Sequence, residues 1–154
     1  MNQDIMQALQ SSVHKVFDTM IHLPVKAGVP TSQVYPATLF DVSAVIGVTG
    51  DISGTITVQM KQKAALMITS AMLQAPANEL SAEVGDAVGE LGNMIAGSIK
   101  NEMSAKGMDF NISIPAVVTG AGHFIGTTTN AEAVLHPFFV QSEPMIVTIC
   151  VKRT

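Results

Sequence analysis

Asp86, Glu90 and Asn93 follow one another at intervals of four and three residues, in a stretch whose apolar residues have helical spacing. At about 100° per residue, a helix brings these three side chains within an arc of roughly 60°, together with Gly97. A carboxylate accepts hydrogen bonds and an amide both accepts and donates them, so this face can bind polar groups of a partner. Because Gly97 has no side chain, an incoming partner has room to reach Glu90 and Asn93.

The helix that carries these residues is rich in glycine. Each interior glycine costs a helix about 1 kcal/mol relative to alanine, so several of them need a structural reason. Gly85, Gly89 and Gly92 lie on one flank with Ala96, and small residues there suit the close approach of a neighbouring helix or strand. The core-facing side is expected to hold Val84, Val88, Leu91, Ile95 and Ile99. Gly97 lies on the polar face, where no packing within the chain explains it.

A solvated surface is the alternative interpretation of this polar face. Every amphipathic helix has such a face, and a glutamate followed three residues later by an asparagine is common by chance. Three features favour a binding or catalytic surface instead. They are the scarcity of charge elsewhere in the chain, the absence of long side chains around Gly97, and Pro115 in the segment after the helix.

Helical spacing of apolar residues predicts the elements that position this surface. The expected helices cover residues 4–22, 61–74 and 80–106. Asn78 or Ser81 can cap the third helix, which ends at Lys106-Gly107, a basic residue followed by glycine. An extended connection is expected after the first helix because of its three prolines, Pro24, Pro30 and Pro36.

Strand patterns occupy the rest of the chain. Two strands, at about residues 38–48 and 52–60, are expected to form a hairpin around Gly50-Asp51. Four later segments also have strand composition: FNISIP, AVVTGAGHF, NAEAVLHPFFVQ and EPMIVTICVK. We interpret GAGHF as a hairpin turn, because a phosphate-binding loop would be followed by a helix. Residues 1–154 are therefore expected to form one α+β domain, with helices grouped on an antiparallel or mixed sheet.

The bulk composition excludes some classes of function. A net charge of −4 with only eight Lys and Arg, none of them clustered, argues against nucleic-acid binding. Charged residues make up 13% of the chain, against about 25% in typical proteins, so we expect apolar surface to be covered by a partner or a second subunit. The sequence has neither a secretory signal nor an apolar run of about 18 residues, which predicts a cytoplasmic protein without membrane insertion.

Neither a metal site nor a nucleophilic centre is expected in this chain. No pair at a ligand spacing occurs among the four histidines, His14, His22, His123 and His136. Cys150, between Ile149 and Val151, has the surroundings of a buried and inert thiol.

The pattern Asp86-x3-Glu90-x2-Asn93-x21-Pro115 resembles the signature of the CheC/CheX/FliY family, phosphatases of the chemotaxis response regulator CheY. The segments FDVSAVIGVTGDISGTITV, GELGNMIAGSIKNEM and VLHPFFV also resemble the CheX branch, and the resemblance covers nearly the whole chain. CheC-type and FliY-type members commonly carry two such motifs, whereas residues 5–20 contain no Glu-x-x-Asn here. The single motif is therefore similar to the CheX pattern.

This resemblance implies an enzyme that hydrolyses the phosphoaspartate of a CheY-like receiver domain. Asn93 would orient the attacking water and Glu90 would pair with the receiver's active-site lysine. Asp86, Gly97 and Pro115 would complete the surface that binds the partner. No cofactor is implied in this chain, because the receiver would supply Mg²⁺.

The resemblance also implies a homodimer of CheC/CheX-like fold, with two long helices packed together on the sheet and one sheet edge used for dimerisation. A non-catalytic module that binds a receiver or a flagellar-switch component is the alternative function, since docking needs Glu90 but not Asn93. The sequence does not identify the receiver, the signalling pathway or the strand at the dimer edge.

Overall fold

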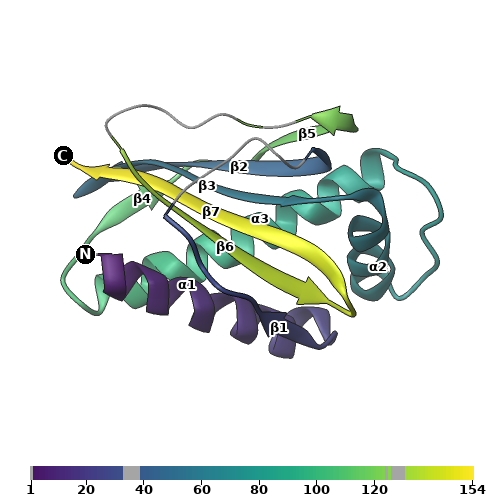
Figure 1. Cartoon of the computed structure of the whole chain (residues 1–154), viewed down its shortest axis with the longest axis horizontal. Coiled ribbons are helices and arrows are strands. Elements are labelled where there is room, and N and C mark those ends of the chain that lie inside the picture. The colour runs from purple at the N-terminus through teal and green to yellow at the C-terminus, as the bar shows by residue number, and fades with distance from the viewer. Residues whose placement is uncertain (1, 33–38, 124, 126–130) are drawn as a thin grey trace.

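The computed structural model describes residues 2–32, 39–123, 125 and 131–154 (Figure 1). Its helical elements are α1 (Asn2–Val16), the π-helical turn η1 (Phe17–Ile21), α2 (Gln62–Leu73) and α3 (Ala82–Ser104). Its strands are β1 (Val25–Ala27), β2 (Phe40–Gly50), β3 (Ile52–Met60), β4 (Phe110–Ile112), β5 (Ala116–His123), β6 (Glu132–Val140) and β7 (Glu143–Arg153). Together they confirm the expected α+β architecture.

The described strands form one antiparallel sheet. Across it, β1, β6, β7, β3 and β2 follow one another. The outer side of β2 pairs with β4 along its C-terminal part and with β5 along its N-terminal part. β1 and β5 therefore lie at opposite edges. In the view of Figure 1, α3 runs behind the sheet, where it contacts β2, β3, β4 and β5.

The helices α1 and α3 pack together, as expected. Both bury apolar stripes, whose side chains of at most 1% exposure include Leu9, Val13, Ile95 and Ile99. At the rim of the contact, Ser11 Oγ donates to Glu102 Oε1 at 2.6 Å, and Lys106 Nζ lies 3.4 Å from Asp4 Oδ1. Exposed ion pairs contribute little, so the buried apolar stripes hold the two helices together. None of the described helices combines the length and hydropathy that crossing a membrane requires.

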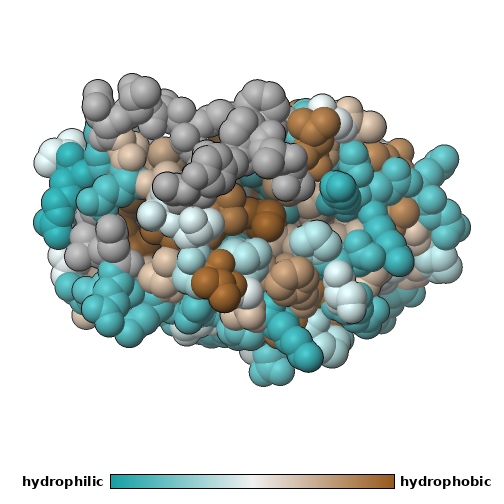
Figure 2. All heavy atoms as spheres, in the orientation of Figure 1, coloured by the Kyte–Doolittle hydropathy of each residue, from teal (hydrophilic) through white to brown (hydrophobic). Residues whose placement is uncertain are grey.

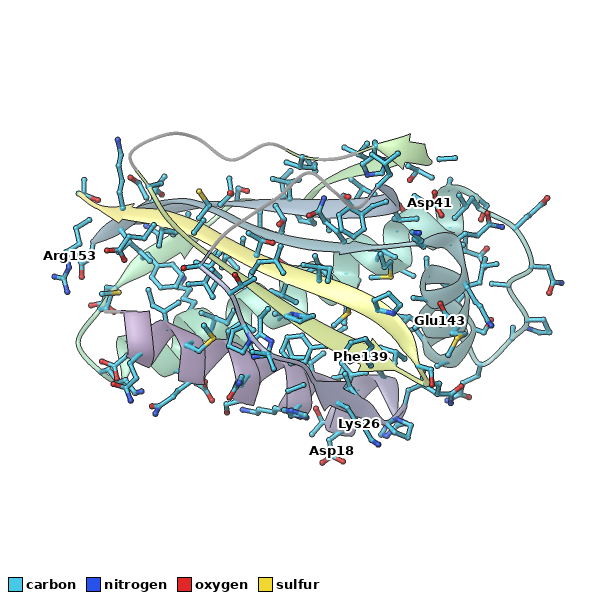
Figure 3. All side chains as sticks on the ribbon, viewed as in Figure 1. Asp18, Lys26, Asp41, Phe139, Glu143 and Arg153 are labelled. Carbon is cyan, nitrogen blue, oxygen red and sulfur yellow. The ribbon has the colours of Figure 1, made fainter. Side chains whose placement is uncertain are left out.

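Two carboxylates of the sheet, labelled in Figure 3, lie near the N-terminus of α2, and one of them caps it. Lys61, at the N-cap position, makes no capping hydrogen bond with its side chain. Asp41 Oδ2, from β2, instead accepts a hydrogen bond from the Gln62 N–H at 2.7 Å. Glu143 Oε1, at the start of β7, lies 3.3 Å from Lys63 Nζ. The strands thus satisfy a helix end that the local sequence leaves uncapped.

Most element boundaries agree with the sequence prediction. The hairpin between β2 and β3 turns at Gly50, whose φ of 137° favours glycine. Of the two possible caps of α3, Ser81 is the one used, and its Oγ accepts a hydrogen bond from the Val84 N–H at 3.4 Å. Residue 38, expected at the start of a strand, lies outside the described residues.

One expectation about the irregular segments is wrong, and another is incomplete. GAGHF is not a hairpin turn, because its first four residues, 120–123, are the end of β5; Phe124 lies outside the described residues. Glycine at 122, where φ is 73°, allows the strand a conformation that most residues avoid. The proline-rich connection is extended at residues 25–27, as expected, but the sequence did not show that this segment, β1, pairs with β6. A strand of three residues is too short to show the alternation that identifies strands in a sequence.

His136 of β6 is fully buried. Its ring stacks on Phe138 with centroids 4.3 Å apart. Gln10 Nε2 of α1 donates to His136 Nε2 at 2.8 Å, and His136 Nδ1 donates to Pro137 O at 3.0 Å. These two hydrogen bonds require a neutral ring that carries its proton on Nδ1. Burial lowers the pKa of His136, the hydrogen bond to Pro137 opposes this shift, and the charge of His14 lowers the pKa further.

We expect the free energy of unfolding to decrease as the pH falls below about 6.5, the pKa of histidine in an unfolded chain. In that range the unfolded chain binds a proton at residue 136 that the folded chain resists. The stabilisation is therefore complete above the unfolded-state pKa and is lost as the pH falls toward the lower folded-state value. Denaturant unfolding of wild type and His136→Gln at several pH values measures this difference.

The His136→Gln variant should lose part of the pH dependence. His22→Asn is the control, because His22 is exposed and asparagine tolerates its φ of 62°. Parallel curves of stability against pH for wild type and His136→Gln would contradict this account of the buried ring.

Candidate functional site

Glycine allows α3 to approach β2 closely. A Cβ atom on Gly92 would lie 3.0 Å from Ala44 Cβ and 3.0 Å from Ile46 Cδ1. Carbon atoms pack best at about 3.5–4.0 Å, so a side chain here would push the helix away from the sheet. Ala44 and Ile46 are themselves fully buried. Gly92 therefore fixes the depth at which α3 lies on β2.

The same flank of α3 meets β5. A Cβ atom on Gly85 would lie 3.3 Å from Thr119 Oγ1, and one on Gly89 would lie 3.0 Å from Val117 Cγ2. The row of small residues expected from the sequence thus packs against a strand. This contact holds β5 beside the part of α3 that contains Glu90.

The remaining face of α3 is open, as the sequence predicts. Asp86 and Glu90 are exposed, and Asn93 is half-buried. Among the described residues, nothing lies within 4 Å of the Cβ position of Gly97. The structure therefore brings Asp86, Glu90, Asn93 and Gly97 together on one surface of the chain.

Pro115 borders this surface. It lies between the end of β4 and the start of β5, and its Cγ is 3.7 Å from the Cβ position of Gly89. Gly89 precedes Glu90 directly and lies one turn before Asn93. The proline thus packs on the helix beside the polar face, in addition to separating two edge strands.

The structure also contains a serine–histidine pair that the sequence prediction missed. Ser43 Oγ lies 2.7 Å from His123 Nε2, His123 Nδ1 lies 2.7 Å from Gly120 O, and Gln59 Nε2 donates to Ser43 Oγ at 3.1 Å. Eighty positions separate the serine from the histidine, so no local pattern indicates the pair. Ser43 is fully buried and points away from α3, because its neighbour Ala44 faces that helix. Because the Ser43 hydroxyl is closed off from solvent, we interpret the pair as a hydrogen bond that joins β5 to β2.

The described residues offer no group of three or more His, Cys, Asp or Glu side chains that could hold a metal ion. Cys150 is a buried free thiol, as expected. The polar face of α3 is therefore the arrangement in the described residues that best fits a partner's reactive group. Its carboxylates can bind a cation, and its amide can orient a small molecule such as water.

Comparison with known proteins shows the family of this chain. The model of a family described as chemotaxis phosphatase CheX matches residues 42–139. The CheY-P phosphatase CheX of Thermotoga maritima is 31% identical over 121 residues, which cover 78% of this chain and 78% of that protein.

Solved structures are similar over nearly the whole chain. A CheC-like superfamily protein from Shewanella sp. PV-4 has a TM-score of 0.92 and 31% identity, with 99% of both chains covered. The chemotaxis protein CheX from Vibrio vulnificus has a TM-score of 0.90 and 31% identity, with 96% of this chain and 99% of that chain covered. The CheX of a CheX–CheY–BeF3–Mg²⁺ complex from Borrelia burgdorferi shares the fold, with a TM-score of 0.84, 22% identity, and 96% and 97% of the two chains covered.

Gly97→Ala and Gly92→Ala are expected to change stability in opposite directions. Both substitutions remove a helix penalty of about 0.5–1 kcal/mol, and at residue 97 nothing opposes that gain. At residue 92 the new methyl group collides with Ala44, and overpacking of this kind costs about 1–3 kcal/mol. Thermal unfolding of the two variants measures both effects. A Gly97→Ala protein less stable than wild type would show that this face is not open.

Proposed function

This chain belongs to the CheX family of CheY-phosphate phosphatases, and from that premise we propose that Asn93 and Glu90 carry out its hydrolysis of the phosphoaspartate on a CheY-like receiver domain. The open polar face of α3 is the observation that carries this proposal. Glu90 is exposed, Asn93 is half-buried, and the Cβ position of Gly97 has no neighbour within 4 Å among the described residues. A helix face without neighbours of its own can enter the pocket of another protein.

The role of Asn93 follows from the chemistry of the substrate. Phosphoaspartate is an acyl phosphate, and its hydrolysis requires a water molecule in line with the bond that breaks, together with compensation of the charge on the phosphoryl oxygens. Water oxygen forms a bond to phosphorus as the bond from phosphorus to the carboxyl oxygen breaks, which leaves inorganic phosphate and a free aspartate. The Asn93 carboxamide accepts a hydrogen bond from the water and donates one to the phosphoryl group. The carboxamide takes no proton, so it contributes by positioning the attacking water.

Glu90 has a different role, because a carboxylate repels a phosphate. We place the receiver's active-site lysine against it, where a charge-assisted hydrogen bond docks the helix and holds the lysine. Asp86, one turn earlier, extends the acidic docking surface. Gly97, one turn after Asn93, leaves space for the receiver, and Pro115 borders the contact on the side of β5.

The receiver supplies Mg²⁺ in this proposal. In the solved Borrelia burgdorferi complex, CheX is present with CheY, BeF3 and Mg²⁺, and BeF3 stands in for the phosphoryl group of an acyl phosphate. A receiver that carries both the phosphoryl group and the metal ion needs only an aligned water and a docking charge from its phosphatase. The polar face of α3 offers these two groups.

Asn93→Ala should lower kcat by about 10²-fold or more, because the attacking water loses the group that positions it. Phosphate release from a phosphorylated CheY-like receiver with Mg²⁺ gives the rate. Asn101→Ala is the matched control, since Asn101 is an exposed asparagine on the same helix, two turns beyond Asn93.

An Asn93→Ala protein with the wild-type rate would contradict the proposed role of the amide. If wild type binds the receiver without accelerating phosphate release, the chain is a receiver-binding module and the hydrolytic proposal fails. The Asn101→Ala control separates both outcomes from a general weakening of α3.

We also propose that two copies of the chain pair through β5. Residues 116–122 of this edge strand are all exposed, and Val117 and Val118 have exposures of 37% and 40%. The sequence has no Asp, Glu, Lys or Arg from residue 110 to residue 131, so β5 lacks the charges that protect free sheet edges. Figure 2 shows hydrophobic side chains at the surface near β5. The opposite edge, β1, has only three residues, one of which is Lys26 (Figure 3).

Val118→Lys is expected to convert the dimer into a monomer, because a lysine on the pairing strand brings two like charges together at the interface. Sedimentation equilibrium of the variant gives the molecular mass. Val29→Lys is the control, since Val29 is 84% exposed and follows β1 at the other edge. Equal masses for Val118→Lys and wild type would contradict the assignment of β5 as the pairing edge.

A further inference from the structure

The connection between β4 and β5 contains one residue more than the segment of β2 that it faces. β4 pairs Ile112 with Val48 of β2, and β5 pairs Ala116 with Val45. Three steps along β2 thus face four steps along its neighbour, which is the geometry of a β-bulge. Bulges are frequent beside active sites, where they redirect a side chain.

Hydrogen bonds hold this bulge in place. Ser113 N–H donates to Gly47 O at 2.9 Å, and Gly47 N–H donates to Ser113 Oγ at 2.7 Å. Ser113 Oγ in turn donates to Ile114 O at 2.9 Å. On the other side of Ile114, Pro115 packs against α3 at Gly89. The backbone is therefore fixed both before and after Ile114.

Ile114 itself is 89% exposed, more than any other large apolar side chain among the described residues. A single exposed isoleucine is common on protein surfaces. Here, however, the side chain stands on a hydrogen-bonded bulge, and its chain neighbour Pro115 packs against the helix immediately before Glu90. An exposed apolar side chain thus lies one residue before the proline that borders the polar face of α3.

We propose that Ile114 is the apolar contact by which this chain recognises its receiver domain, next to the Glu90–Asn93 pair. This inference rests on the proposed function and adds a specificity-determining residue to it. The partner is a receiver whose surface carries an apolar patch beside the lysine and the phosphorylated aspartate. Because Ser113 and Pro115 already order the bulge, little conformational entropy is lost when Ile114 becomes buried.

A second copy of the chain is the other possible occupant, and the observations favour the receiver. A copy that pairs with β5 forms hydrogen bonds with the backbone of residues 116–123, whereas Ile114 lies before that strand. Pro115 has no N–H and cannot donate to an added strand. Ile114 instead precedes Pro115, which packs on α3 at Gly89, the residue before Glu90.

Ile114→Thr tests the proposal, because threonine keeps the β-branched shape and removes apolar surface. The probe is a CheY-like receiver loaded with BeF3 and Mg²⁺, which binds without turnover, and calorimetry gives its Kd. Loss of about two methylene equivalents of buried surface should raise Kd roughly tenfold. With the phosphorylated receiver, KM should rise while kcat at saturation stays at the wild-type value. Val29→Thr, at a similarly exposed valine near β1, should change neither.

Ser113→Ala provides a second arm, because it removes the hydroxyl that bridges Gly47 and Ile114. It should raise Kd in the wild-type background and have little further effect in Ile114→Thr. Such non-additivity shows that the serine acts through the isoleucine. Equal effects of Ser113→Ala in both backgrounds would overturn that positioning role.

An unchanged Kd for Ile114→Thr overturns the proposal. If the Kd is unchanged but the molecular mass of the variant differs from that of wild type, Ile114 belongs to an interface between copies of the chain. The proposed function fails separately. In that case wild type binds the loaded receiver but does not accelerate phosphate release, and the comparison of Kd values still decides the role of Ile114. A wild-type chain that binds none of a panel of CheY-like receivers overturns both.

Discussion

The close packing of α3 on the sheet is the constraint on which the rest of the structure depends. Gly92 lets the helix approach β2, and Gly89 lets β5 and Pro115 lie against its flank. These glycines lower the intrinsic stability of the helix, and the tertiary contacts that they permit offset this loss. As a result, one side of α3 is fixed by the sheet while the side that carries Glu90 and Asn93 remains free.

This arrangement fits a reaction that is divided between two proteins. Asp86 and Glu90 lie exposed on α3, whereas Ser43, which bonds His123, is buried on the other side of β2. An acyl phosphate is already activated, so a phosphatase needs to align water and dock its substrate rather than form a covalent intermediate. A rigid helix that presents one carboxylate and one amide can meet these requirements in a partner's pocket.

Periodicity in the sequence predicts the long elements well, because each element has a buried face of sufficient length. The hairpin at Gly50 and the polar face around Glu90 follow from local residue types, which also narrow the cap of α3 to Asn78 or Ser81. Contacts between distant segments are less accessible. The Ser43–His123 pair, the role of β1 and the bulge at Ile114 depend on strand order and register, which no local pattern specifies. The glycines indicated a close neighbour but did not identify it as β5.

The structure of this chain bound to a CheY-like receiver that carries BeF3 and Mg²⁺ tests the central claim most directly. The account predicts the Asn93 carboxamide within about 3 Å of the BeF3 group or of a water molecule in line with it. It also predicts the Glu90 carboxylate on a lysine of the receiver. A complex in which the receiver binds elsewhere, while the polar face of α3 stays in solvent, would contradict it.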